Sequence, residues 1–207
     1  NDGSTIINNT GGLITATNLF AIDVNGAAAT ISNAGTILGF VDLTAFADST
    51  TNTGLFDARL TSDFGAGVDV FTNSGTVRTA VNSGASENVV FANLETFNNT
   101  GVITMIDGQA GDTFTLSGNY NGSGSASLGV DATSTLADNL IVVGNASGTT
   151  AVNVNLLGTG FVDPNGILVV DNGTSTPSAF VLVSINNSPL LVYSLVQRGS
   201  DSFLPPA

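Results

Sequence analysis

Side chains that could act as nucleophiles, bases or metal ligands are few in this sequence. Its 207 residues include 16 acidic residues and three arginines, while His and Cys are absent. A zinc site built from His and Cys is therefore excluded. Serine is abundant, but a Ser–His–Asp triad needs a His, and no G-x-S-x-G nucleophile elbow occurs. Carboxylates are the remaining candidates for chemistry.

The two glutamates, Glu87 and Glu95, are the one carboxylate pair that could act as acid and base on a polysaccharide. Their separation of eight residues does not determine whether the two carboxyl groups point toward each other. Enzymes of this kind usually combine a carboxylate cluster with an Arg or Lys base, whereas Arg59, Arg78 and Arg198 are scattered along the sequence. We therefore interpret both glutamates as solvated charges at strand edges. We expect no catalytic residue, no cofactor-binding residue and no enzymatic activity.

Two short segments, GAGVD (Gly65–Asp69) and GQAGD (Gly108–Asp112), are similar to the Gly-Gly-x-Gly-x-Asp repeat that binds calcium. That mechanism needs consecutive nine-residue turns, so that neighbouring coils share each ion. Here Asp69 and Asp112 are 43 residues apart and each segment stands alone. We interpret the glycines as turn residues before a strand and expect no metal site and no cofactor.

The composition describes an acidic chain with unusually few charges. Hydrophobic residues make up 42% and charged residues 9%, against about 25% in an average soluble domain. The net charge of −13 makes nucleic acid and anionic membranes unsuitable partners, because both require a basic face. No apolar run is long enough for a transmembrane helix. Any signal peptide is expected to lie outside this fragment.

Short strand-like segments dominate the sequence, and helical periodicity is almost absent. No useful window keeps a 3.6-residue apolar period, because Gly, Asn or Thr interrupts it. Segments rich in Val, Ile, Leu, Phe and Thr are bounded by Gly, Asn, Asp or Ser, which is typical of strands. They are VITMI, TFTLSG, NLIVVG, AVNVNLLG, GILVVD, AFVLVSI and LLVYSLV. The pattern predicts an all-β fold.

An Asn with a Gly two positions later recurs in four other stretches, TIINNTGGLI, ATISNAGTIL, DVFTNSGTVR and TFNNTGVITM. The Asn residues are Asn9, Asn33, Asn73 and Asn99, and the glycines two positions later are Gly11, Gly35, Gly75 and Gly101. Two positions before each Asn stand Ile7, Ile31, Phe71 and Phe97, and four positions after it stand Leu13, Ile37, Val77 and Ile103. The Asn spacings of 24, 40 and 26 residues are close to one coil of a solenoid.

A parallel β-helix explains these uniform columns, because equivalent residues of successive coils stack about 4.8 Å apart. We expect the apolar residues to form two interior columns and the Asn-x-Gly segment to form a repeated corner. Asn and Gly tolerate the left-handed backbone of a sharp bend, and stacked Asn amides can pass hydrogen bonds from coil to coil. The alternative is four unrelated Asn-x-Gly hairpin turns.

Two irregularities divide the chain. The 40-residue spacing contains Asp42–Gly67, which we interpret as an inserted loop that includes an exposed Asn52, although a slightly larger coil would also account for it. Farther on, DTFTLSGNYN aligns Phe114 with Phe71, Gly118 with Gly75 and Tyr120 with Val77, and places Leu116 where Asn belongs. We expect the Asn ladder to end there. The predicted organisation is repeat coils over 1–105 and a C-terminal core over 106–207, with the boundary near Met105.

The C-terminal half carries a family resemblance. The segment GDTFTLSGNYNGSGSASLGVDATSTLADNLIVVGNASGTTAVNVNLLG, followed by GILVVDNGTSTPSAFVLV and LLVYSLVQRGSDSFL, resembles the closing passenger segment of pertactin-like autotransporters of Gram-negative bacteria. The resemblance covers about Gly108 to Leu204, and SLGVD departs from the usual SLxLD. It implies a right-handed single-stranded parallel β-helix. It also implies that the last coils form an autochaperone-like core, which folds first outside the cell.

The same resemblance implies a location and partners. We expect a cell-surface or extracellular passenger of the type V secretion pathway, whose outer-membrane translocator barrel lies outside this fragment. A host or sister-cell surface and a second copy of the chain are the expected contacts of such an adhesin-type protein. The alternative is a non-catalytic scaffold for a secreted enzyme whose active domain precedes Asn1. The sequence before Asn1 would distinguish these two functions.

Overall fold

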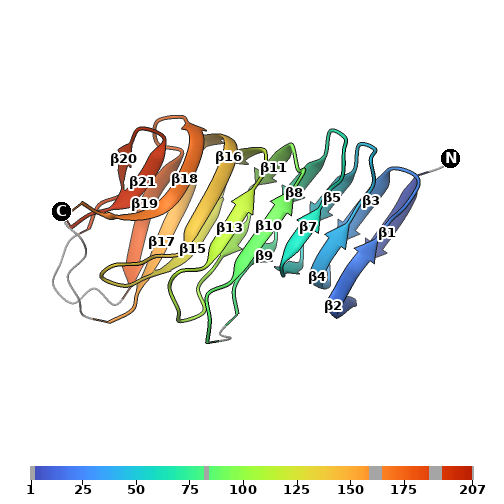
Figure 1. The fold of residues 1–207 in the computed structure, drawn as a ribbon, viewed down its shortest axis with the longest axis horizontal. Helices are drawn as coiled ribbons and strands as arrows, with labels where there is room; N and C mark the ends of the chain where they lie inside the picture. The colour runs from blue at the N-terminus through green and yellow to red at the C-terminus, as the bar shows by residue number, and fades with distance from the viewer. Residues whose placement is uncertain (1–2, 82–83, 159–164, 187–192, 207) are drawn as a thin grey trace.

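The protein is an elongated parallel β-solenoid, with β1 (Ser4–Asn8) near one end of the stack and β21 (Asp201–Leu204) near the other (Figure 1). The computed structural model describes residues 3–81, 84–158, 165–186 and 193–206. All regular elements in these residues are β-strands, which confirms the all-β, parallel β-helical prediction. Among the described residues there is no helix long and apolar enough to cross a membrane.

Each coil contributes strands to three faces, and on each face a strand pairs in parallel with its counterparts in the neighbouring coils. The first face contains β1 (Ser4–Asn8), β3 (Ala29–Asn33), β5 (Ser49–Asn52), β8 (Val70–Asn73), β11 (Thr96–Asn99), β14 (Asn119–Gly122) and the second half of β16 (Asn139–Gly148). Each of these strands stacks on the next without a change of register.

The second and third faces are built in the same way. The second face contains β2 (Leu13–Asp23), β4 (Thr36–Asp42), β6 (Leu55–Ala58), β9 (Thr76–Arg78), β12 (Val102–Thr104), β15 (Ser127–Ala132), β17 (Thr150–Leu156) and β19 (Phe180–Asn186). The third face contains β7 (Thr61–Asp63), β10 (Asn88–Ala92), β13 (Thr113–Leu116), the first half of β16, and β18 (Ile167–Ser175).

Antiparallel pairing occurs at the C-terminal end. There β21 (Asp201–Leu204) pairs with β18 and with β20 (Val196–Arg198). The resulting hairpin occupies the outer edge of β18, which would otherwise present unpaired backbone groups. The predicted strand LLVYSLV lies partly outside the described residues. Within it, Tyr193 forms an isolated bridge with Pro206.

The interior is an apolar column with a continuous stack of aromatic rings. Phe71 and Phe97 lie parallel with ring centroids 5.1 Å apart, and Tyr120 continues the stack 6.0 Å farther on. Phe180 lies 5.7 Å beyond Tyr120 and belongs to the second face. All four side chains are buried. Residues far apart in sequence are thus joined into one core, because three successive coils supply Phe71, Phe97 and Tyr120 at equivalent positions.

Stacked asparagines form a corner, as predicted. The amide ladder consists of Asn8, Asn33, Asn52, Asn73 and Asn99, all buried. The Nδ2 atom of each donates to the Oδ1 atom of the next, at 2.8, 2.7, 2.8 and 2.9 Å in order. The first four also donate Nδ2 to a backbone carbonyl across the corner. The ladder therefore gives partners to polar groups that the bend would leave unpaired.

The predicted register of the first repeat is wrong by one residue. Asn8, not Asn9, pairs with Asn33, and Gly12, not Gly11, lies beneath Gly35. A shift of one residue exchanges the two faces of a strand. Ile7 and Leu13 are accordingly 65% and 64% exposed, while Ile6 and Ile14 pack against the core in their place.

The corner glycines are required by close packing, and the left-handed backbone predicted for this corner is not seen at them. Gly54 and Gly75 have no positive φ. A Cβ atom on either would lie 2.2 Å from the carbonyl oxygen of the corner glycine in the preceding coil. Such a contact is impossible without moving the backbone, so any side chain here would separate the coils.

The inserted loop predicted for Asp42–Gly67 is also wrong. This segment supplies β5, β6 and β7, which form a complete coil. Asn52, expected to be exposed, is buried in the amide ladder, and the Asn spacings of 19 and 21 residues show two coils where one was expected. Polar Thr50 stands in the interior column here, opposite Ile31 and Phe71. The coil therefore lacks the apolar residue by which the other repeats were recognised in the sequence.

The alignment of the fifth repeat needs a similar correction. Leu116 pairs with Phe91 on the third face, so it does not replace a corner Asn. Tyr120 pairs with Phe97 and belongs to the aromatic stack, where Val77 had been predicted as its equivalent. Gly122 occupies the position opposite Asn99. The amide ladder does end at this coil, because Gly122 and then Gly148 follow Asn99 in the column.

Replacing Asn73 or Asn52 by Leu should destabilise the folded chain by about 1–3 kcal/mol, because each change leaves buried partners of the amide unpaired. Asn9→Leu, at an exposed position next to the ladder, is the matched control and should change stability little. Urea unfolding of the three variants checks this. Equal losses of stability for Asn9→Leu and Asn73→Leu would show that the amide ladder does not stabilise the fold.

Candidate functional site

The structure does not bring Glu87 and Glu95 together as an acid–base pair. They stand at opposite ends of β10, just before it and beyond it. The Glu95 carboxylate accepts the backbone N–H of Asp69 at 2.7 Å, and the backbone N–H of Glu87 donates to Asp112 at 2.6 Å. Each glutamate is therefore part of a different corner of the solenoid.

Glu95 belongs to a column of carboxylates that crosses three coils at the entrance to the first face. The first carboxylate column consists of Asp48, Asp69 and Glu95, which immediately precede β5, β8 and β11. Each carboxylate accepts the backbone N–H of the equivalent residue in the preceding coil, at 2.5, 2.6 and 2.7 Å. The column satisfies backbone donors at this bend, as the amide ladder does at its own corner.

A second column stands at the entrance to the third face. The second carboxylate column consists of Glu87, Asp112 and Asp138, which immediately precede β10, β13 and β16. Asp138 accepts the backbone N–H groups of Gly111, Asp112 and Asp131, at 2.9, 3.1 and 2.6 Å. The sequence signal for both columns is an acidic residue directly before a strand, and neither column was predicted from it.

These columns explain the two segments that are similar to a calcium-binding repeat. Asp69 ends GAGVD and Asp112 ends GQAGD, and both side chains are buried with Oδ1 bonded to a backbone N–H of the preceding coil. Across the described part of the chain, no group of three or more Asp and Glu is arranged to hold a metal ion. The two aspartates act as corner residues in this structure.

Two of the three arginines are not scattered in space. Asp57 is fully buried and forms ion pairs with Arg59, at 2.5 Å, and with Arg78 of the following coil. The hydrogen bond that Arg78 donates to Asp57 is the main cause that raises the pKa of Arg78. Arg198 lies elsewhere, 5.3 Å from the centre of the Phe203 ring. Because Asp57 is buried between both guanidinium groups, we interpret this cluster as a structural brace between coils.

The amide ladder ends on a tyrosine. Asn99 Nδ2 donates to the Tyr120 hydroxyl at 3.1 Å, and that hydroxyl shares a 2.7 Å hydrogen bond with Thr150. Burial raises the pKa of Tyr120, against the opposing effect of these two hydrogen bonds. The hydroxyl thus links the last Asn of the ladder to β17, in the part of the chain where Gly122 and Gly148 take the place of asparagine in the column.

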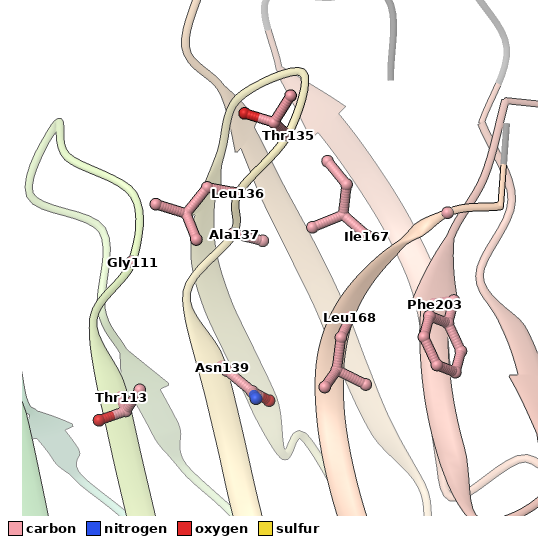
Figure 2. A pocket seen from close by; sticks show the side chains of 10 residues that line it. Gly111, Thr113, Thr135, Leu136, Ala137, Asn139, Ile167, Leu168 and Phe203 are labelled. Atoms are coloured by element: carbon pink, nitrogen blue, oxygen red, sulfur yellow. The ribbon is translucent and has the colours of Figure 1, made fainter. Parts of the chain in front are cut away.

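A surface pocket of about 430 Å³ lies near the C-terminal end, on the third face (Figure 2). Leu136, Leu168 and Phe203 contribute apolar side chains to its lining, and Thr113 and Asn139 contribute polar ones. The Oδ1 atom of Asn139 is buried without a hydrogen-bond partner among the described residues. None of the described residues lining the pocket has an ionisable side chain, so the pocket offers no acid or base for catalysis.

A larger groove of about 600 Å³ crosses several coils beside β10. Its apolar lining includes Leu38 and Leu60, and its polar lining includes Arg59, Glu87 and Asn88. The Arg59 guanidinium is already paired with Asp57. The groove has the volume of a small-molecule site, and Arg59 and Glu87 are the titratable side chains among its described lining residues.

These features define a class of protein: a parallel β-solenoid whose buried polar groups hold its own corners together. Sequence similarity to a curated protein adds to this structural description. Over 78 residues, or 36% of this chain, the sequence is 38% identical to a protein described as "Probable autotransporter YfaL" of Escherichia coli (strain K12). The matched segment spans 6% of that protein's length. No protein-family model matches the chain.

The similarity to an autotransporter and the solenoid fold agree with each other. Together they confirm the predicted resemblance to an autotransporter passenger β-helix.

Replacing Tyr120 by Phe should destabilise the protein by about 1–2 kcal/mol, because Asn99 and Thr150 lose a shared buried partner while the ring stack is kept. Tyr193→Phe is the matched control, since Tyr193 is also a buried tyrosine but lies outside the amide ladder. Chemical unfolding measures both. Identical unfolding midpoints for the two variants would show that the Tyr120 hydroxyl does not stabilise the end of the ladder.

Proposed function

We propose that this chain is a section of an autotransporter passenger and serves as the rigid stalk and folding core of an adhesin-type surface protein. The observation that carries the proposal is the continuous parallel pairing of strands from β1 to β19, with side-chain hydrogen bonds closing the corners. Each coil of such a stack is held by its neighbouring coils. The stack can therefore act as a rigid spacer without contacts to other domains. The similarity to an E. coli autotransporter supports the same function.

The proposed setting is the Gram-negative cell surface. The partner within the same polypeptide would be a C-terminal outer-membrane translocator barrel beyond this fragment. A host or sister-cell surface would be the external contact, in adhesion, aggregation or biofilm formation. We also propose that the chain has no catalytic activity of its own. This is supported by the placement of its buried acids, most of which accept backbone N–H groups.

The first face is the surface best suited to contacts between copies. Its outward side chains on β3, β5, β8, β11 and β14 are uncharged and almost all polar: Thr30, Ser32, Ser49, Thr51, Val70, Thr72, Thr96, Asn98, Asn119 and Asn121. Two molecules of net charge −13 repel each other, so an uncharged face is where they can approach most closely. Because the coils are regularly spaced, equivalent side chains recur at the same interval along both copies.

The coils after Met105 are proposed as the part that folds first. Four of the longer strands, β16, β17, β18 and β19, lie here, and the β20–β21 hairpin pairs along the edge of β18. Phe180 in β19 is buried and stacks on Tyr120, so the core of this part is closed by its own residues. A solenoid folds by adding coils to an existing one, and the best-packed end can start the process.

A fragment of residues 107–207 should therefore fold alone, whereas a fragment of residues 1–104 should not. Longer strands bury more apolar surface against an ordering cost of roughly 1.5 kcal/mol per residue. Protection from a protease tests both fragments. Digestion of the C-terminal fragment, with survival of the N-terminal one, would reverse the proposed order.

In cells, Phe180→Ala should reduce surface display more than Ile31→Ala, although both side chains are buried. The expected loss of stability is about 3–5 kcal/mol for the Phe variant. A failed C-terminal core would leave the remaining coils unfolded, whereas a defect near β3 would affect only its neighbours. Surface staining of both variants, normalised to expression, decides between these outcomes. Equal display would argue against a folding core.

A further inference from the structure

Both carboxylate columns bury negative charge without a counter-charge. Asp69 and Asp112 are fully buried, and although Oδ1 of each accepts a backbone N–H, Oδ2 has no hydrogen-bond partner among the described residues. A buried carboxylate oxygen with no donor is costly when the group is ionised. A proton on that oxygen removes the charge and leaves the hydrogen bond to Oδ1 in place.

The groups that face these aspartates are acidic on every side. Asp69 lies against Asp48 and Glu95 of its own column. Asp112 lies among Glu87, Asp107 and Asp131, and it also faces Asp138. Like charges at close range oppose ionisation of all members.

No basic side chain is available to neutralise either column. The chain has no His, and its three cationic side chains are arginines. Arg59 and Arg78 pair with Asp57, and Arg198 lies over Phe203. Protonation is therefore the one way in which the described residues can remove this buried charge.

We propose that the solenoid is an acid-stabilised structure, in which protonation of the two carboxylate columns tightens the coils as the surroundings become mildly acidic. Burial, as the largest cause, raises the pKa of Asp69 and Asp112 to about 6 and that of Asp138 to about 7. In the unfolded chain these groups titrate near 3.8. Between these values the folded state holds more protons than the unfolded state, so stability is greatest at low pH and falls as pH rises toward 7.

The test is thermal unfolding of the full chain at about pH 5 and about pH 8. The wild type should melt several degrees higher at the lower pH. Asp112→Asn keeps an oxygen to accept the Glu87 N–H but removes the charge. It should raise the melting temperature at pH 8 and reduce the difference between the two pH values. Asp69→Asn, in the other column, should act in the same direction and replaces the first variant if that one does not fold.

Asp23→Asn is the matched control, since it removes one negative charge from an exposed side chain. It should leave most of the pH dependence in place, because Asp23 contributes to the raised pKa of Asp42 and lies in neither column. If it reduces that dependence as much as Asp112→Asn does, the effect comes from the total charge of −13 and the proposal is wrong. A wild-type melting temperature that is constant or rises from pH 5 to pH 8 would also overturn it. Carboxyl ¹³C NMR of the wild type gives an independent readout, with Asp titrations near 6 to 7 expected.

Discussion

The constraint on which this structure depends is the pairing of backbone and side-chain polar groups at the bends between faces. Strands satisfy their own N–H and C=O groups by stacking, but a bend interrupts that pairing while remaining buried. The chain meets the constraint with one amide per coil from Asn8 to Asn99 and with carboxylates such as Asp48 and Asp138 at two other bends. Every coil therefore needs its neighbour, and the stack is cooperative along its axis.

This use of polar residues bears on function. In many enzymes a buried carboxylate with a raised pKa is a candidate acid or base. Here Asp69, Asp112 and Asp138 are buried because they cap backbone donors, and the two glutamates are divided between different corners. The side chains that could do chemistry are thus already engaged in holding coils together. The proposed stalk function is compatible with this arrangement, because it requires no reactive group and leaves the exposed faces and loops for recognition.

How far the sequence predicted the structure depended on how many independent signals each coil carried. The coils of Asn33, Asn73 and Asn99 were placed correctly because apolar residues and a glycine agreed with the asparagine. The first coil was misplaced by one residue because the sequence has two adjacent asparagines, Asn8 and Asn9, and two adjacent isoleucines, Ile6 and Ile7. In each pair one side chain points into the core and the other into solvent, and residue type does not tell which. The coil of Asn52 was missed because Thr50 is polar at an interior position, although TNTG fits the repeat. Tyr120 and the carboxylate columns act through contacts between coils that spacing alone does not reveal.

The central claim is that the asparagine amides form one continuous buried ladder, and hydrogen exchange of their side-chain NH₂ groups tests it most directly. Amide protons in a buried, bonded network exchange only when the structure opens, whereas those of an exposed side chain exchange freely. In a continuous ladder, the Nδ2 protons of Asn33, Asn52 and Asn73 exchange orders of magnitude more slowly than those of exposed Asn9, and at rates similar to the backbone amides of their own coils. Exchange of the Asn52 and Asn73 side chains as fast as that of Asn9 would contradict the claim.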